Sequence, residues 1–194
     1  LAYLITGRFY FMEEVQFAAT TNFLIQPDDV RSYGSGIFRS DAGAATTRGV
    51  AWSWRTLAQA VIVTPDADST GLRTDFIASM QANVDYYWTR YVGSSGTRSN
   101  PQGFVEPYYT EDDVVGDGKL RARSWMSDFL TGATGYALAM SMPLATTQAT
   151  RLTEFFRWKA RDAIGKLGAT FHMDKTGAPV AEAAMAKADQ DKLN

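Results

Sequence analysis

The stretch from Thr46 to Val63 reads TTRGVAWSWRTLAQAVIV and carries the clearest helical pattern in the chain. Apolar side chains recur in it at a spacing that predicts one buried helix stripe, made of Val50, Trp54, Leu57, Ala58 and Val61. A second face combines a tryptophan with basic and amide side chains, namely Arg48, Trp52, Arg55 and Gln59. A solvated helix face disfavours tryptophan. We therefore expect either a ligand-binding groove here or packing against a neighbouring helix with both arginines paired to carboxylates.

Similar signals predict four further helices, over residues 9–26, 72–91, 122–142 and 147–167. Ser69 or Thr70 is the expected N-cap of the helix that begins at residue 72. The first residues resemble the end of a helix that stops at Gly7, which suggests that the chain is part of a longer protein. No segment has a convincing strand period. The expected fold is all-α, built of antiparallel helical hairpins over residues 1–167, with a turn and a weak helix over 168–194.

The connections between the predicted helices alternate in length. Segments 27–44 and 93–121 are long, whereas 64–71 and 142–148 are short. In an antiparallel array alternate connections lie at the same end, so both long loops are expected to share one rim. Loops of this length are usually functional or disordered, and these two are rich in aromatic residues that include Tyr108 and Tyr109. The sequence therefore predicts an aromatic and polar cleft at that rim.

Three carboxylates are candidate catalytic groups. Asp128 shares an arc of its predicted helix with Trp125 and Phe129, where desolvation would raise its pKa as a general acid requires. The alternative is that Asp128 is a first-turn acid that pairs with a neighbouring arginine. Glu13 and Glu14 are adjacent, so they point about 100° apart and do not both line one narrow site.

Composition excludes several classes of function. The 194 residues contain no Cys and one His, so thiolate chemistry and multi-histidine metal sites are excluded. A net charge of −2 argues against nucleic acid as the partner, and no apolar run is long enough to span a membrane. Residues 66–71 resemble the first half of a calcium-binding EF-hand loop, but the twelfth position would be Ile77, which has no carboxylate ligand. We therefore expect no metal site, and we expect no cofactor.

Two stretches resemble (α/α)-toroid domains, which occur in six-hairpin glycosidases and polysaccharide lyases. Tyr3-Leu4-Ile5-Thr6-Gly7 and the residues that follow resemble a turn between helices of such domains, and Arg48 to Arg55 resembles an inner helix. The resemblance covers roughly residues 1–167 and implies a toroid fragment, or a short α/α solenoid, with a cleft at one rim. It assigns no catalytic residue.

The expected function is a carbohydrate-active domain that resembles glycoside hydrolases or polysaccharide lyases and binds a poly- or oligosaccharide. Arg48, Arg55 and Gln59 would bind hydroxyl or uronate groups, and Trp52, Trp54, Trp125, Tyr108 and Tyr109 would stack on sugars or line the cleft. Asp128, Glu13 or Glu14 would be the acid or base, while a lyase would use a tyrosine or His172. The alternative is a non-catalytic helical module that binds a glycan or a protein, or acts as a scaffold. The sequence leaves the oligomeric state and the compartment open, and a secreted or periplasmic location is favoured if a signal peptide lies upstream.

Overall fold

The computed structural model describes residues 2–41, 46–94, 96, 103–106, 109–110, 120–121 and 124–160. Within these ranges the regular secondary structure is helical, apart from one pair of two-residue strands, and the all-α prediction is confirmed. The elements are α1 (Ala2–Thr6), α2 (Phe9–Leu24), η1 (Tyr33–Ser35), α3 (Thr47–Val63), α4 (Leu72–Tyr91), β1 (Tyr109–Thr110), β2 (Leu120–Arg121), α5 (Ser124–Ala139) and α6 (Thr146–Arg157).

Most helix boundaries agree with the predictions. Helix α4 spans the predicted residues, and α3 begins after Thr46, whose Oγ1 accepts the Gly49 N–H at 3.2 Å. Helices α2 and α5 are shorter than predicted, and α6 continues as a π-helical turn over 158–160. The rest of its predicted length, 161–167, and the predicted C-terminal segment 168–194 lie outside the described residues.

The start of α4 differs from the predicted cap. Gly71 occupies the N-cap position with φ of 86°, a left-handed conformation that favours glycine and that carries no capping side chain. The exposed N–H groups of the first turn are instead satisfied from the preceding residues. Asp68 Oδ2 accepts the Arg73 N–H at 3.1 Å, and Thr70 Oγ1 accepts the Leu72 N–H at 3.3 Å.

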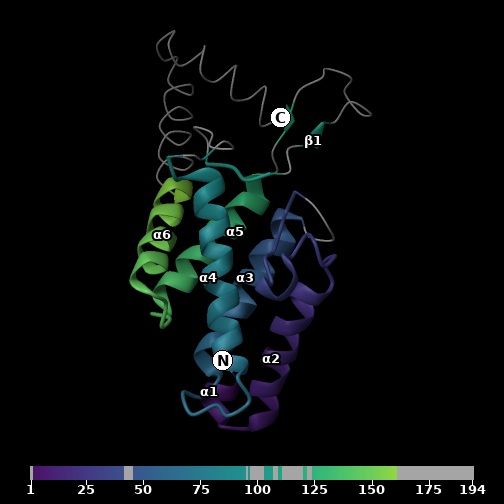
Figure 1. The fold of residues 1–194 in the computed structure, drawn as a ribbon, viewed down its shortest axis with the longest axis vertical. Coiled ribbons are helices and arrows are strands. Elements are labelled where there is room, and N and C mark those ends of the chain that lie inside the picture. Colours follow the sequence, from purple (N-terminus) through teal and green to yellow (C-terminus); the bar gives the residue numbers. More distant parts are fainter. Residues whose placement is uncertain are drawn as a thin grey trace.

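Four of the long helices form two pairs, α3 with α5 and α4 with α6 (Figure 1). Contacts between α3 and α5 join Arg48 to Trp125, Trp52 to Phe129 and Gln59 to Tyr136, and each pair is 77 residues apart. Contacts between α4 and α6 join Asp85 to Arg151 and Trp88 to Glu154, each 66 residues apart. A constant offset means that the paired helices run parallel. The helices therefore alternate in direction along the chain, as antiparallel hairpins require.

The two long connections meet at one end of the helices. Ser40 Oγ donates a hydrogen bond to the Glu106 carbonyl oxygen, and the Arg90 guanidinium contacts both Asp41 at 2.5 Å and Glu106 at 2.7 Å. The short turns lie toward the other end (Figure 1). The predicted arrangement of the described loop residues at one rim is therefore correct.

An aromatic cluster joins three helices at the centre of the core. The Trp54 ring of α3 lies 5.4 Å from the Tyr87 ring of α4 and 5.9 Å from the Phe155 ring of α6. Tyr91 and Trp158 extend the cluster through stacked contacts at 5.5–6.0 Å. Every residue of the predicted stripe on α3 is fully buried. Burial of large rings is the main source of stability that these contacts provide.

We expect Trp54→Ala to lower the free energy of unfolding by about 3–5 kcal/mol, because it leaves a cavity between three helices. Trp54→Phe should cost less, since it also removes a buried indole N–H that has no partner among the described residues. Urea unfolding measures both. Trp52→Ala, two residues away at a half-exposed position, is the matched control, and an equal loss in that variant would contradict the assignment of the core.

Candidate functional site

The mixed face predicted on α3 lies beside α5 and forms one continuous surface with it, which we call the α3–α5 face. Its members are Arg48, Trp52, Arg55, Gln59, Trp125, Phe129, Gly132 and Tyr136. The core stripe of α3 fixes the rotation of that helix, so this face points away from Trp54. Trp52 and Trp125 are 51% and 50% exposed, so both residues are accessible from solvent.

Arginines and rings are interleaved along this face. The Arg55 guanidinium lies 4.8 Å from the Trp52 ring centroid and 5.8 Å from that of Phe129, while the Trp52 and Phe129 rings meet edge to face. The Arg48 guanidinium lies 5.5 Å from the Trp125 ring centroid. Further along, Gln59 Nε2 donates to the Tyr136 hydroxyl at 3.4 Å. These cation–π contacts hold both guanidinium groups against flat apolar surfaces.

Neither arginine of the face has a carboxylate partner among the described residues. The Nε of Arg55 is also buried without a hydrogen-bond acceptor in that part of the chain. The alternative prediction, in which both arginines pair with acids, is therefore wrong for this part of the structure. The predicted packing of Trp52 against a neighbouring helix is correct. The face thus carries two positive charges that no carboxylate of the described residues neutralises.

The three catalytic candidates lie at separate places. Glu14 lines a cavity of about 200 Å³ with Gln59 and Tyr136, at one end of the α3–α5 face. Glu13 lines a different cavity of about 590 Å³, on the opposite flank of α2. Asp128 is exposed next to Phe129, near the other end of the face. Because Tyr136 follows Asp128 by eight residues, these ends lie about 12 Å apart along the helix.

Several other predicted contributors fall elsewhere. Trp54 is fully buried in the core, so the prediction that it stacks on a sugar is wrong. Tyr109 belongs to strand β1, while Tyr108 and His172 lie outside the described residues. The loop aromatics Phe38 and Phe104 are buried, because they anchor the long loops to the helices. These two loop aromatics therefore belong to the packing, whereas Tyr33 of η1 is 69% exposed.

A charged cluster at the rim was not predicted. Arg39 and Arg90 both contact Asp41, and Arg90 also contacts Glu106. Partial burial by itself raises the pKa of Asp41, but the hydrogen bond from Arg39 and the charge of Arg90 outweigh this effect and lower the pKa below its ordinary value. The paired charges of this cluster hold the two long loops against the end of α4. Such pairing between distant segments leaves no local pattern in the sequence.

A buried lysine was also missed. Lys159 is fully buried, and its Nζ donates to Ser127 Oγ at 2.9 Å and to the Gly103 carbonyl oxygen at 3.1 Å. Desolvation lowers the pKa of Lys159 to about 7, against an opposing effect from the charge of Asp128. A serine beside a neutral lysine is a known nucleophile and base combination. Because Ser127 is 4% exposed and Lys159 is fully covered, the pair instead ties residue 103 to helices α5 and α6.

Comparison with known proteins found no matching family model, no matching curated protein and no matching solved structure. Among the described residues, no three His, Asp or Glu side chains form a group suited to a metal ion. In the same part of the chain, no helix combines the length and the apolar character that a membrane span needs. The α3–α5 face is therefore interpreted from its own chemistry.

The depressed pKa of Lys159 predicts a specific pH dependence of stability. Between about pH 7 and the ordinary lysine value of 10.5, the unfolded chain binds a proton that the folded chain does not, so the free energy of unfolding rises with pH. Lys159→Met should lack this rise, because it removes the titrating group. The difference between the pH profiles of the two proteins then reports Lys159 alone. Urea unfolding from pH 6 to pH 9.5 measures the effect, and parallel profiles of the two proteins would contradict it.

Proposed function

We propose that the α3–α5 face binds acidic oligosaccharides, with its two arginines holding uronate carboxylates and its two half-exposed tryptophans stacking on sugar rings. The observation that carries this proposal is the pair of guanidinium groups that lie on aromatic rings without acidic partners among the described residues. Guanidinium forms bidentate hydrogen bonds with carboxylates, which suits a uronate. Flat rings beside such donors complete a surface for a sugar acid.

The spacing of the arginines favours a chain over a single sugar. Arg48 and Arg55 are seven residues apart on α3, which places their backbone positions about 10 Å apart along the helix. Two carboxylates of one linear ligand therefore match them better than one carboxylate does. Between the aromatic pairs, Gly132 is exposed, and a Cβ built on it would meet nothing within 4 Å. That space allows a ligand to lie close to the backbone of α5.

The proposal of binding alone is better supported than a hydrolysis that uses Glu13, Glu14 or Asp128. Two-carboxylate glycosidases hold their acid and base about 5–5.5 Å or 6.5–9.5 Å apart. Glu14 and Asp128 stand near opposite ends of the face, and Glu13 lines the cavity on the other flank of α2. A lyase reaction would instead need a base beside a neutralised uronate. Tyr136, which accepts a hydrogen bond from Gln59, is the group on the face that suits that role.

The parallel helix pairs also support the resemblance to (α/α)-toroid domains as part of this proposal. In such an array α3 and α5 would belong to one layer and α4 and α6 to the other, each pair held at a constant chain offset. The α3–α5 face would then line the concave side, in the place where the resemblance implies a cleft. A short α/α solenoid has the same local packing, so both arrangements keep the proposed binding face.

Arg55→Ala should weaken binding of oligogalacturonate about tenfold, because it removes a charge-assisted hydrogen bond. Isothermal titration calorimetry measures this change, and added salt should weaken the wild-type interaction. A neutral oligosaccharide of the same length should bind less tightly. Release of reducing ends or of an unsaturated uronate, followed in the same samples, would show whether cleavage accompanies binding.

Arg151→Ala is the matched control for this experiment. Its guanidinium also lies over a tryptophan, 4.5 Å from the Trp88 ring centroid, but it is neutralised by Asp85 at 2.6 Å. We expect this variant to bind as the wild type does. An equal loss in both variants, absence of binding to acidic sugars, or tighter binding of single-stranded DNA would each contradict the proposal.

A further inference from the structure

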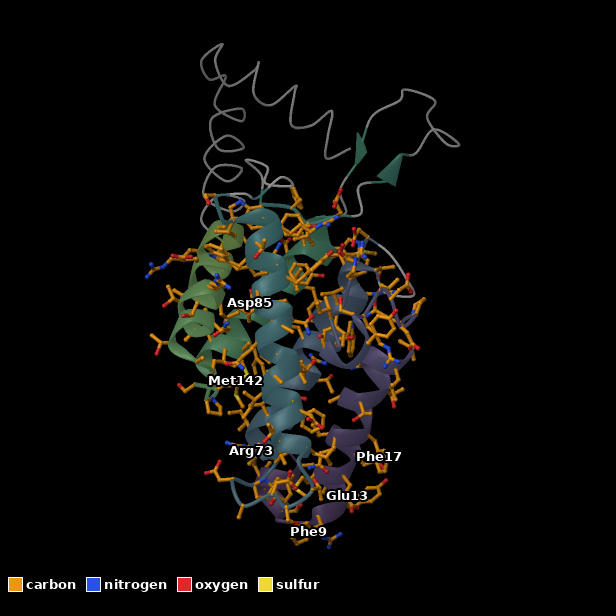
Figure 2. All side chains as sticks on the ribbon, viewed as in Figure 1. Phe9, Glu13, Phe17, Arg73, Asp85 and Met142 are labelled. Carbon is orange, nitrogen blue, oxygen red and sulfur yellow. The ribbon has the colours of Figure 1, made fainter. Side chains whose placement is uncertain are left out.

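Helix α2 presents large apolar side chains to solvent along its whole length. We call its exposed side the outer face of α2, and its members are Tyr10, Glu13, Glu14, Phe17, Thr21 and Leu24. Phe17 is 70% exposed, Tyr10 is 61% exposed and Leu24 is 54% exposed. Phe9, Glu13 and Phe17 lie along one side of α2 (Figure 2), where they line a cavity with residues of the α3–α4 connection. An exposed patch of large apolar side chains marks a surface at which another molecule binds.

Helices α2 and α6 differ in the side chains that they expose. Exposed positions of α6 carry polar side chains, among them Thr147, Thr150 and Arg157. The exposed side of α6 is therefore polar. Helix α2 differs, because exposed Leu4, Ile5 and Ile25, which flank it in the chain, add further apolar surface. The outer face of α2 therefore has the character of an interface.

We propose that the outer face of α2 binds a second copy of this chain, with the two α2 helices antiparallel about a twofold axis at Phe17. The large apolar positions of the face are placed symmetrically about that residue. Tyr10 lies seven residues before Phe17 and Leu24 lies seven residues after it, so an antiparallel partner places each of them opposite the other. Phe17 meets its own copy at the axis. A twofold interface requires this kind of self-complementarity.

The charges on the face select the antiparallel direction. Glu13 and Glu14 lie four and three residues before Phe17, and the matching positions after it are Thr21 and Thr20. An antiparallel copy therefore places the glutamates opposite threonines, about 10 Å along the helix axis from the glutamates of the other chain. A parallel copy would place glutamates opposite glutamates, which is unfavourable. At the ends of the pair, exposed Arg8 of one copy comes toward exposed Asp29 of the other.

The apolar area is of the size that such an interface needs. A fully exposed aromatic side chain offers about 150–250 Å². Phe9, Tyr10 and Phe17 each expose more than 60% of their surface, and four aliphatic side chains beside them expose more than half of theirs. Together they approach the ~800 Å² per partner of a standard interface. The 590 Å³ cavity lined by Phe9 and Phe17 lies open next to this surface, where Leu24 and Ile25 of the second copy would arrive.

Disulfide trapping tests the axis directly, because the chain contains no cysteine. Phe17→Cys should form a cross-linked dimer under mild oxidation, since its copy lies within disulfide reach at the axis. Thr150→Cys, on the polar side of α6, is the control and should stay monomeric on a denaturing gel. Equal cross-linking of the two variants, or none in Phe17→Cys, would overturn the proposed geometry.

Sedimentation equilibrium of the wild type and two charge variants tests the direction without truncating the interface. Thr21→Lys should tighten the dimer about fivefold by meeting Glu13 or Glu14 of the other copy, and Thr21→Glu should weaken it by a similar factor. A wild type that stays monomeric through the micromolar range, or equal shifts in both variants, would overturn the proposal. A monomer would instead indicate a different occupant of this face, such as a further helical hairpin.

Discussion

The contact of Trp54 with Tyr87 and Phe155 is the constraint on which the rest of the structure depends. It joins α3, α4 and α6 at one point and lies within a core that also holds Tyr91 and Trp158. Because one side of α3 is committed to this contact, its rotation is fixed. The same helix must then present Arg48, Trp52, Arg55 and Gln59 on another side. The buried cluster and the proposed binding face are therefore two consequences of one helix orientation.

The parallel register of α3 and α5 turns that orientation into a surface. A shift of α5 by one turn would separate Arg48 from Trp125 and Gln59 from Tyr136. These contacts and that between the Trp52 and Phe129 rings all join residues at the same distance along the chain. The charged cluster at the rim holds the long loops that lead into α3 and α5, through Arg90, Asp41 and Glu106. Polar pairing thus fixes the connections, aromatic packing fixes the core, and neither uses the arginines of the α3–α5 face. We propose that those arginines bind a ligand.

The helices were predictable from the sequence because their signals are local, and α4 spans the predicted residues. The core stripe of α3 followed from the same periodicity. The partners of each face were not predictable, since they depend on which helices become neighbours. Lys159 illustrates the limit, because a lysine near a helix end is normally solvated, and only the fold brings Ser127 and Gly103 to it. Trp54 is the opposite case. Its residue type suits stacking on a sugar, but its position on the buried stripe places it in the core.

The indole N–H signals of the five tryptophans provide the most direct test of the central claim, that the α3–α5 face is the ligand surface. Trp52 and Trp125 lie half exposed on that face, whereas Trp54 is buried, Trp158 is nearly so, and Trp88 donates to Glu154 on another side. Titration with oligogalacturonate, followed by ¹⁵N–¹H NMR with signals assigned from Trp→Phe variants, reads all five at once. The account predicts that the signals of Trp52 and Trp125 shift and that the other three do not. A shift of Trp88 instead, or no shift of Trp52 and Trp125 at saturating ligand, would contradict it.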